Sequence, residues 1–218
     1  MKYQLTLDNK PFPHTLGKIV CVGRNYADHA RELDNPVPAE PLLFMKPATA
    51  AVAMEQPFAI PTDRGSCHFE TEMALLIGEP LHRASEMEAA KAITGVGLAF
   101  DLTLRDVQST LKQKGHPWEI AKAFDGSCPL SAFVTARGID WQNVQLHMSR
   151  NGDLQQDGNS SHMITPVLPL LSYISQHFSL LPGDVVLTGT PAGVGPLQSG
   201  DQIDAVLVGI LQVSTAVK

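Results

Sequence analysis

Two apolar segments that carry three acidic residues place the strongest constraint on how this chain can fold. They are residues 69–78 (FETEMALLIG) and residues 94–101 (TGVGLAFD), and both have the length and composition of buried strands. Successive side chains of a strand point to opposite faces. Glu70 and Glu72 would therefore share one face of the first strand with apolar residues, while the opposite face is apolar as well. We predict that both carboxylates are buried.

Buried carboxylates need a compensating partner. An unpaired buried charge costs several kcal/mol, so Glu70 and Glu72 require a cation, basic side chains or protonation. Asp101 ends the second segment and could add a third oxygen to the same site. Three carboxylates without Cys or His favour a hard cation, Mg²⁺ or Mn²⁺, over zinc. Spacing alone leaves one alternative open, in which Glu-x-Glu is the solvent-exposed face of an edge strand.

Length and composition indicate one medium-sized globular domain. The chain has 218 residues, of which 44% are hydrophobic, and its formal net charge is −6. The negative charge and the lack of a basic run argue against a nucleic-acid partner. No segment reaches the roughly 18 apolar residues of a membrane span, so we expect no membrane contact and a cytoplasmic location. The three cysteines Cys21, Cys67 and Cys128 lack metal-ligand spacing and are expected to be reduced core residues.

Alternating and apolar segments predict more strands than helices. This pattern favours an α+β, mainly β architecture over a doubly wound α/β fold. The Gly-rich segment 189–195 does not open a helix, which excludes a dinucleotide-binding loop. The predicted strands are residues 2–7, 18–23, 42–47, 184–188 and 202–213, the predicted helices begin near residues 24, 85, 103 and 165, and a hairpin turn is predicted at Asn151-Gly152.

A short polar helix is predicted over residues 24–33, followed by a proline-rich loop at 34–41. His29 and Glu32 are three residues apart and hence share one face of this helix. A helix with so little core to hold it could serve as a mobile lid over a ligand. The simpler alternative is a solvated helix face. Further polar candidates, each with a structural alternative of its own, are Arg24, Lys46, Gln108, Lys122, Gly189 and Thr190.

Six short motifs, taken together and in this order, resemble the fumarylacetoacetate hydrolase family. They are residues 23–29 (GRNYADH), 44–47 (FMKP), 70–72 (ETE) followed by 77–78 (IG), 100–103 (FDLT), 122–125 (KAFD) and 188–195 (TGTPAGVG). The match extends from about residue 18 to the C-terminus. It leaves residues 1–17 as an N-terminal strand or arm before one catalytic domain at 18–218. The chain is most similar to the compact branch of acylpyruvate hydrolases and oxaloacetate-handling enzymes.

The resemblance implies a fold, an assembly and a set of site residues. The fold is a mixed β-sandwich roll with short helices, and the assembly is a homodimer. Mg²⁺ or Mn²⁺ would bind to Glu70, Glu72 and Asp101. The implied catalytic residues are His29 and Glu32 on the lid and Lys122 beside the metal, and the implied substrate-binding residues are Arg24, Lys46, Gln108, Gly189 and Thr190.

The activity implied first is a divalent-metal-dependent hydrolase that cleaves the C–C bond of acylpyruvates, such as acetylpyruvate or fumarylpyruvate, to pyruvate and a carboxylic acid. In that reaction His29, oriented by Glu32, would activate a water molecule. The alternative is an oxaloacetate tautomerase or decarboxylase, or an isomerase or decarboxylase of dienoic diacids in aromatic catabolism. Each of these substrates is a small 2-oxo acid. An inactive binding protein is a further alternative, but it would have no chemical need for His29, Glu32 and Lys122 together.

Overall fold

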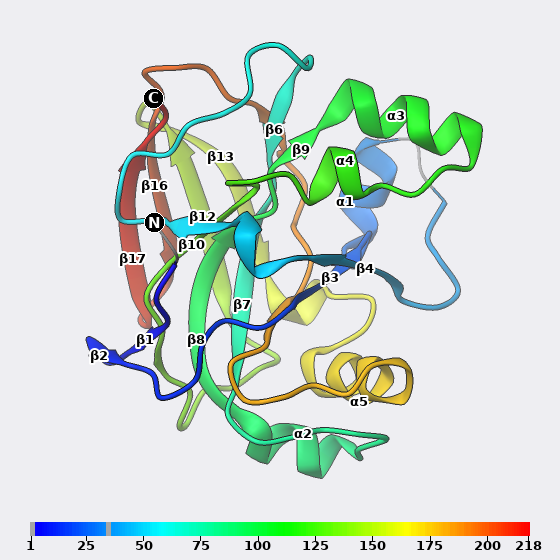
Figure 1. The fold of residues 1–218 in the computed structure, drawn as a ribbon, viewed down its shortest axis with the longest axis vertical. Helices are drawn as coiled ribbons and strands as arrows, with labels where there is room; N and C mark the ends of the chain where they lie inside the picture. The colour runs from blue at the N-terminus through cyan, green and yellow to red at the C-terminus, as the bar shows by residue number, and fades with distance from the viewer. Residues whose placement is uncertain (1–2, 34–35) are drawn as a thin grey trace.

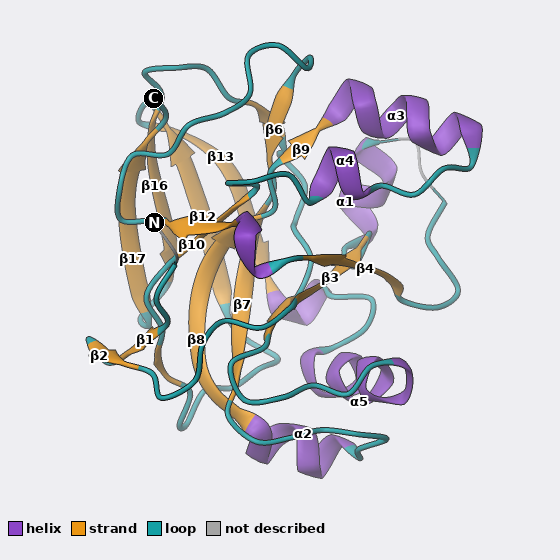
Figure 2. Cartoon of the chain, viewed as in Figure 1, coloured by secondary structure: helices purple, strands orange, loops and turns teal. Residues whose placement is uncertain are grey.

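The computed structural model describes residues 3–33 and 36–218, and most of its regular structure is strand (Figure 1). Two sheets pack face to face, with short helices gathered at two ends of the molecule (Figure 2). The predicted α+β, mainly β architecture is thus confirmed. Of the predicted strand at 2–7, Lys2 lies outside the described residues, and only the short strand β1 (Thr6–Leu7) forms, paired with β2 (Lys10–Pro11).

The larger sheet contains the strands that position the acidic residues. Its order is β4-β3-β14-β7-β8-β10-β5, with β11 paired to β8. The central strands β7 and β8 are antiparallel, and β14 runs parallel to β3. The bounds are β3 (Ile19–Gly23), β4 (Leu42–Lys46), β5 (Ala51–Ala53), β7 (Thr71–Ile77), β8 (Ile93–Phe100), β10 (Cys128–Leu130), β11 (Val134–Thr135) and β14 (Val185–Leu187).

Both faces of β7 are buried, as its sequence predicts. Leu75 belongs to the larger hydrophobic core between the two sheets, whereas Leu76 belongs to a second core on the opposite face. The prediction of one continuous strand over 69–78 is wrong at its start. The chain leaves strand geometry at Glu70, because β6 (Cys67–Phe69) pairs in a different, three-stranded sheet with β9 (Thr103–Leu104) and β15 (Gly195–Pro196).

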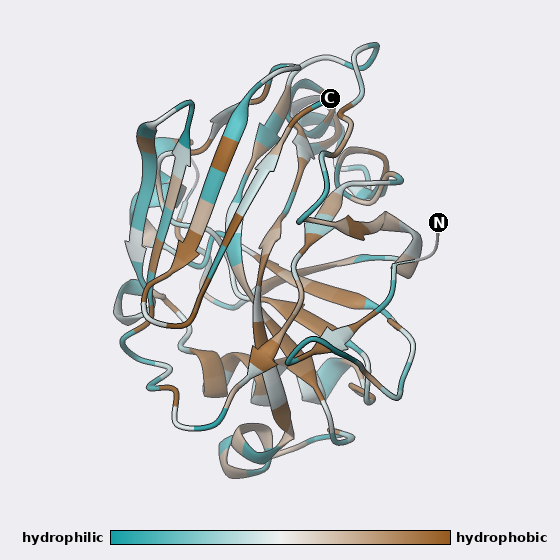
Figure 3. Cartoon of the chain, turned by 90° about the vertical axis from the view of Figure 1, so that its left-hand side faces the viewer, coloured by the Kyte–Doolittle hydropathy of each residue, from teal (hydrophilic) through white to brown (hydrophobic). Residues whose placement is uncertain are grey.

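The second sheet has four antiparallel strands in the order β13-β12-β16-β17. It contains the predicted hairpin, in which Asn151 (φ 56°) and Gly152 (φ 87°) form the turn. The segment 202–213, predicted as one strand, is instead a hairpin that turns through Gly209 (φ 73°). Figure 3 shows hydrophilic and hydrophobic residues alternating along these strands. The bounds are β12 (Gln145–Arg150), β13 (Asp153–Asn159), β16 (Gln202–Leu207) and β17 (Leu211–Ala216).

The helices lie in two groups (Figure 2). α2 (Glu86–Ala92) packs against α5 (Val167–His177) at one end, and α2 has the predicted capping box of Ser85 and Glu88. The predicted Thr165 cap of α5 is wrong, because Pro166 occupies the cap position and no side chain accepts a hydrogen bond there. The Thr165 amide donates to the Asn25 side chain. The other group comprises α1 (Ala27–Glu32), α3 (Arg105–Lys114) and α4 (Glu119–Lys122). Of these three, α4 was not predicted from the sequence. Within the described residues, no helix combines the length and hydrophobicity of a membrane span.

Candidate active site

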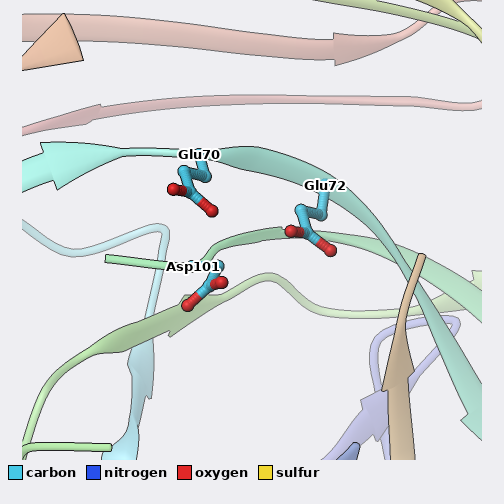
Figure 4. Close-up of side chains that lie close together, drawn as sticks. All are labelled: Glu70, Glu72 and Asp101. Atoms are coloured by element: carbon cyan, nitrogen blue, oxygen red, sulfur yellow. The ribbon is translucent and has the colours of Figure 1, made fainter. Parts of the chain in front are cut away.

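The three acidic side chains meet at one point, beside the end of the β7–β8 pair. Glu70, Glu72 and Asp101 place carboxylate oxygens within 4.8 Å of one another, and Figure 4 shows the three groups turned toward a common space. The pairing of Thr71 with Phe100 sets this arrangement, because it brings the start of β7 next to the end of β8. The Asp101 amide also donates to the Glu70 carbonyl at 2.8 Å. All three side chains are buried.

Three cations contact these acids. Lys122 Nζ lies 2.8 Å from Glu70 Oε2 and 2.6 Å from Asp101 Oδ2. Arg105 Nη2 donates to Glu70 Oε1 at 2.6 Å, and Lys46 Nζ lies 2.8 Å from Asp101 Oδ1. The formal charges of the cluster therefore balance. Lys122 thus contacts two of the three acids.

The electrostatics distinguish Glu72 from Glu70. Burial alone would raise the pKa of Glu70, but Lys122 and Arg105 outweigh it and hold that pKa well below its usual range. Burial, together with the charges of Asp101 and Glu70, raises the pKa of Glu72 well above its usual range. The Gly189 amide donates to Glu72 Oε2 at 2.6 Å. This hydrogen bond lowers the pKa of Glu72 but does not outweigh the burial and the neighbouring charges. A divalent cation would relieve the repulsion at Glu72, so the donor set fits a hard metal ion.

His29 and Glu32 form a pair on α1. Nδ1 of His29 lies 3.4 Å from Glu32 Oε2, and the His29 side chain is buried. The Glu32 carboxylate also accepts the Gly193 amide, at 3.0 Å to Oε1 and 3.2 Å to Oε2. Asn25 fixes the start of α1, because its side-chain amide donates to the carbonyls of Thr165 and Thr188. The pair leaves Nε2 of His29 as the ring nitrogen available for chemistry.

A narrow cavity of about 30 Å³ joins α1 to the acidic cluster. It brings together His29, Arg24, Gln108, Lys122 and Glu70, which the sequence analysis proposed. A space of this size holds only one or two water molecules. The residues of its wall that the sequence analysis missed are Gly23, Leu33, Phe44, Arg105, Lys112 and Trp118.

Three predicted substrate-binding residues, Lys46, Gly189 and Thr190, are not among the residues that line the cavity. Each of them contacts the acidic residues or strand β7 instead. Lys46 is fully buried, and its ammonium group donates to the Ser127 carbonyl at 3.0 Å besides contacting Asp101. Gly189 donates its amide to Glu72. The Thr190 hydroxyl donates to a backbone carbonyl of β7, at 2.9 Å. These polar groups are engaged by the protein in this structure, and a substrate-binding role for the three residues stays a prediction.

Two residues that sequence reasoning missed hold the cluster in place. Arg105 opens α3 shortly after Asp101, and a cation so near three acids was a signal that could have been read. Gln156 accepts the Thr71 amide at 3.0 Å and donates to the Thr190 hydroxyl at 2.7 Å. Nothing in the local sequence of β13 indicates this contact, because its partners are far away in the chain.

Comparison with known proteins identifies the family. The family model described as fumarylacetoacetate (FAA) hydrolase C-terminal matches residues 18–218. Oxaloacetate tautomerase YcgM of Escherichia coli K12 is 54% identical over 192 residues, which cover 87% of this chain and 88% of that protein. The human mitochondrial oxaloacetate tautomerase FAHD1 is 42% identical over 201 residues, covering 92% of this chain and 91% of the human protein. The solved structure of fumarylpyruvate hydrolase from Pseudomonas aeruginosa, in complex with Mn²⁺ and pyruvate, is 33% identical, with a TM-score of 0.92 over 99% of this chain and 95% of that one. The chain belongs to the fumarylacetoacetate hydrolase family.

Proposed function

We propose that this enzyme is a divalent-metal-dependent oxaloacetate tautomerase, which interconverts the enol and keto forms of oxaloacetate. The observation that carries the proposal is the placement of His29 in the same narrow cavity as Glu70 and Lys122. The relatives at 54% and 42% identity bear the oxaloacetate tautomerase name, whereas the hydrolase name belongs to a structure at 33% identity. The names of the more similar relatives therefore favour oxaloacetate tautomerase, which the sequence analysis gave as an alternative, over acylpyruvate hydrolase, which the sequence analysis gave first.

Charge balance supports a metal ion together with a dianionic substrate. Lys46, Lys122 and Arg105 already neutralise the three acids. A divalent cation alone would leave a buried excess of two positive charges, which is unfavourable. Oxaloacetate carries two negative charges, which would offset the two positive charges of the ion. When bound, Mg²⁺ or Mn²⁺ held by Glu70, Glu72 and Asp101 would act as a Lewis acid toward the 2-oxo group, and the Mn²⁺ in the hydrolase relative is consistent with this choice.

The reaction itself is a proton transfer, which His29 can perform. When the enol becomes the keto form, C3 gains a proton and the C2 hydroxyl loses one. We assign His29 Nε2 to the transfer at C3 and Glu32 to the orientation of the imidazole through Nδ1. Lys122, whose pKa Asp101 and Glu70 raise against the effect of burial, stays protonated and can donate a hydrogen bond to the oxygen at C2.

Exclusion of water separates this reaction from hydrolysis. Hydrolysis of an acylpyruvate needs a water molecule between His29 and the distal carbonyl, whereas tautomerisation needs none. A site that closes over the substrate and admits no such water would favour tautomerisation over hydrolysis. An acylpyruvate hydrolase stays the second candidate, because the hydrolase relative superposes over almost the whole chain and its crystal contains pyruvate.

A substrate panel tests the proposal. The loss of enol absorbance is followed with Mg²⁺ for enol-oxaloacetate, acetylpyruvate and fumarylpyruvate, and pyruvate is counted at the end point. We expect rapid loss of enol-oxaloacetate without stoichiometric pyruvate, and no acceleration when EDTA replaces Mg²⁺. Stoichiometric pyruvate from an acylpyruvate, with enol-oxaloacetate decaying at its spontaneous rate, would instead make the enzyme a hydrolase. Stoichiometric pyruvate from oxaloacetate would make it a decarboxylase.

We further propose that residues 18–218 act as a single catalytic domain and that the enzyme is a homodimer. The family match over residues 18–218 supports the first statement. Sedimentation equilibrium tests the second, with twice the chain mass of 23.5 kDa as the expected result. The cytoplasmic location stays a prediction.

A further inference from the structure

Phe44 lies between two cavities. It belongs to strand β4 and lines the narrow catalytic cavity of about 30 Å³, together with His29 and Glu70. It also lines a larger pocket of about 250 Å³. Trp118 and Lys122 line both spaces as well. These three shared residues therefore form the wall between the catalytic cavity and the larger pocket.

Contacts among the three residues hold this wall together. The ring centroids of Phe44 and Trp118 are 6.1 Å apart, with an angle of 58° between the ring planes, which is a tilted aromatic contact. Lys122 Nζ lies 5.1 Å from the centroid of the Phe44 ring, within the range of a cation–π contact. The same ammonium group contacts Glu70 and Asp101. The Phe44 ring thus packs directly against a cation of the acidic cluster.

Strand β4 fixes the direction of the Phe44 ring. Phe44 and Lys46 are two residues apart, so their side chains share one face of the strand, and Lys46 reaches Asp101 from that face. β4 is an edge strand of the larger sheet and contacts α4 (Figure 1). The ring is half-buried and packs against the second hydrophobic core. Phe44 is therefore anchored in the fold.

The larger pocket has a different chemical character from the catalytic cavity. Most of its lining residues are apolar: Leu42, Leu43, Phe44, Met45, Pro117 and Trp118. His116 and Glu119 also line it and are exposed, so the pocket opens to solvent. Such a pocket suits an apolar chain, because burial of each methylene group is favourable.

We propose that Phe44 determines the size of the substrate by closing the catalytic cavity toward the apolar pocket. A short 2-oxo acid such as oxaloacetate has no tail to place beyond this wall. A 2-oxo acid with a long apolar tail needs the volume that the Phe44 ring separates from the site. This inference rests on the proposed function, in that a 2-oxo acid binds at the acidic cluster, and it specifies which members of that class the enzyme accepts.

The test compares two ligands that do not enolise, in the presence of Mg²⁺. Oxamate has the carboxylate and adjacent carbonyl of a 2-oxo acid, and N-hexyloxamate adds an apolar tail to the same group. Calorimetry gives the ratio of their dissociation constants for each protein, so that a general change in affinity cancels. Phe44→Ala removes the ring, and Phe44→Leu keeps an apolar side chain against the second core. Leu42→Ala is the control, because Leu42 lines the larger pocket but not the catalytic cavity.

We expect the wild type to bind N-hexyloxamate at least about 10-fold more weakly than oxamate. Phe44→Ala should reduce this ratio at least about 10-fold, and Leu42→Ala should leave it within about twofold. Phe44→Leu should change the ratio in the same direction by a smaller factor, which decides the question if the alanine variant does not fold.

Four results would overturn the inference: a wild type that binds both ligands equally, a wild type that does not bind oxamate, a ratio unchanged in both Phe44 variants, or an equal reduction in Leu42→Ala. The two proposals fail separately. A wild type without enol-oxaloacetate turnover refutes the tautomerase, while the ratio for the two ligands, neither of which is turned over, still decides the role of Phe44.

Discussion

The carboxylate of Glu32 on helix α1 accepts a hydrogen bond from the backbone amide of Gly193, 161 residues away in the chain. The same loop donates the Gly189 amide to Glu72. One glycine-rich loop therefore contacts both the orienting partner of His29 and a proposed metal ligand. The two halves of the site are held at a fixed separation by backbone groups, and side-chain substitutions cannot readily remove them.

Gly193→Ala should disturb the protein more than a Gly→Ala substitution at another glycine with a similar φ angle. Gly193 has φ +97°, and a Cβ there would lie 1.9 Å from the Gln155 carbonyl oxygen. We expect a loss of about 1–3 kcal/mol in the free energy of unfolding and a lower kcat, since Glu32 loses its support. Gly200→Ala is the control, because Gly200 has φ +94° and open space around it. Its expected loss is about 1 kcal/mol with kcat unchanged, and equal effects of the two substitutions would contradict the account.

Glu72→Gln should separate the stability of the metal-free protein from its affinity for metal. The amide keeps an acceptor for the Gly189 amide and removes a charge that Asp101 and Glu70 repel. In EDTA we expect a Tm equal to or above that of the wild type, and we expect Mg²⁺ to raise the Tm of the wild type alone. Differential scanning calorimetry measures both. A variant that Mg²⁺ still stabilises would remove Glu72 from the ligand set.

The pH dependence of this comparison has a fixed direction. The folded-state pKa of Glu72 lies above its unfolded value. The metal-free wild type is therefore destabilised as pH rises toward the folded-state pKa, because the unfolded chain releases the Glu72 proton more readily than the folded protein does. Glutamine does not titrate. The Tm advantage of Glu72→Gln in EDTA should therefore grow with pH, and an advantage that shrinks with pH would contradict the assignment.

Lys46→Met tests whether Lys46 is a structural residue. The substitution would leave Asp101 with an unpaired buried oxygen, so we expect a loss of about 3–5 kcal/mol in the free energy of unfolding. At a temperature where the variant is folded, KM should change little. Arg64→Met is the comparison, since Arg64 and Asp63 are both exposed and the loss of such a pair costs at most about 1 kcal/mol. A large rise in KM without loss of stability would restore the substrate-binding role.

The cysteine thiols should be unreactive in the folded protein. Burial raises the pKa of Cys67 to about 11 and that of Cys128 to about 12, and Cys21 is also fully buried with a raised pKa. At pH 8 little thiolate is present. Ellman's reagent should therefore label the native protein slowly and all three cysteines rapidly in denaturant. Rapid labelling of the native protein would show that at least one thiol is accessible.

The sequence predicted those parts of the fold that depend on local pattern. The apolar pattern of residues 69–78 indicated that Glu70 and Glu72 are buried, and Asp101 was a candidate for the same site. The Asn151-Gly152 hairpin was likewise predicted, because its turn requires two residues with positive φ. In the hairpin the deciding interactions lie within a few residues of chain.

The parts that were missed depend on contacts between distant segments. The Thr71 amide binds the Gln156 side chain across 85 residues, and no periodicity connects the two positions. Lys112 was also missed, because the cavity wall exists only once α3 lies across from α1. Lys46 was found through the family motif, but its burial beneath Asp101 was not predicted. Pattern identifies faces of elements, and tertiary packing decides which faces meet.

The most direct test of the central claim is the rate of enol-oxaloacetate decay, measured by stopped flow with saturating Mg²⁺ for wild type, His29→Ala and His162→Ala. His29 is buried in the cavity wall, whereas His162 is exposed and lies outside that wall. Calorimetry first confirms that each variant still binds Mg²⁺. If His29 transfers the proton, kcat falls at least about 100-fold in His29→Ala and stays at the wild-type value in His162→Ala. A His29→Ala enzyme that binds Mg²⁺ and removes enol-oxaloacetate as fast as the wild type would contradict the account.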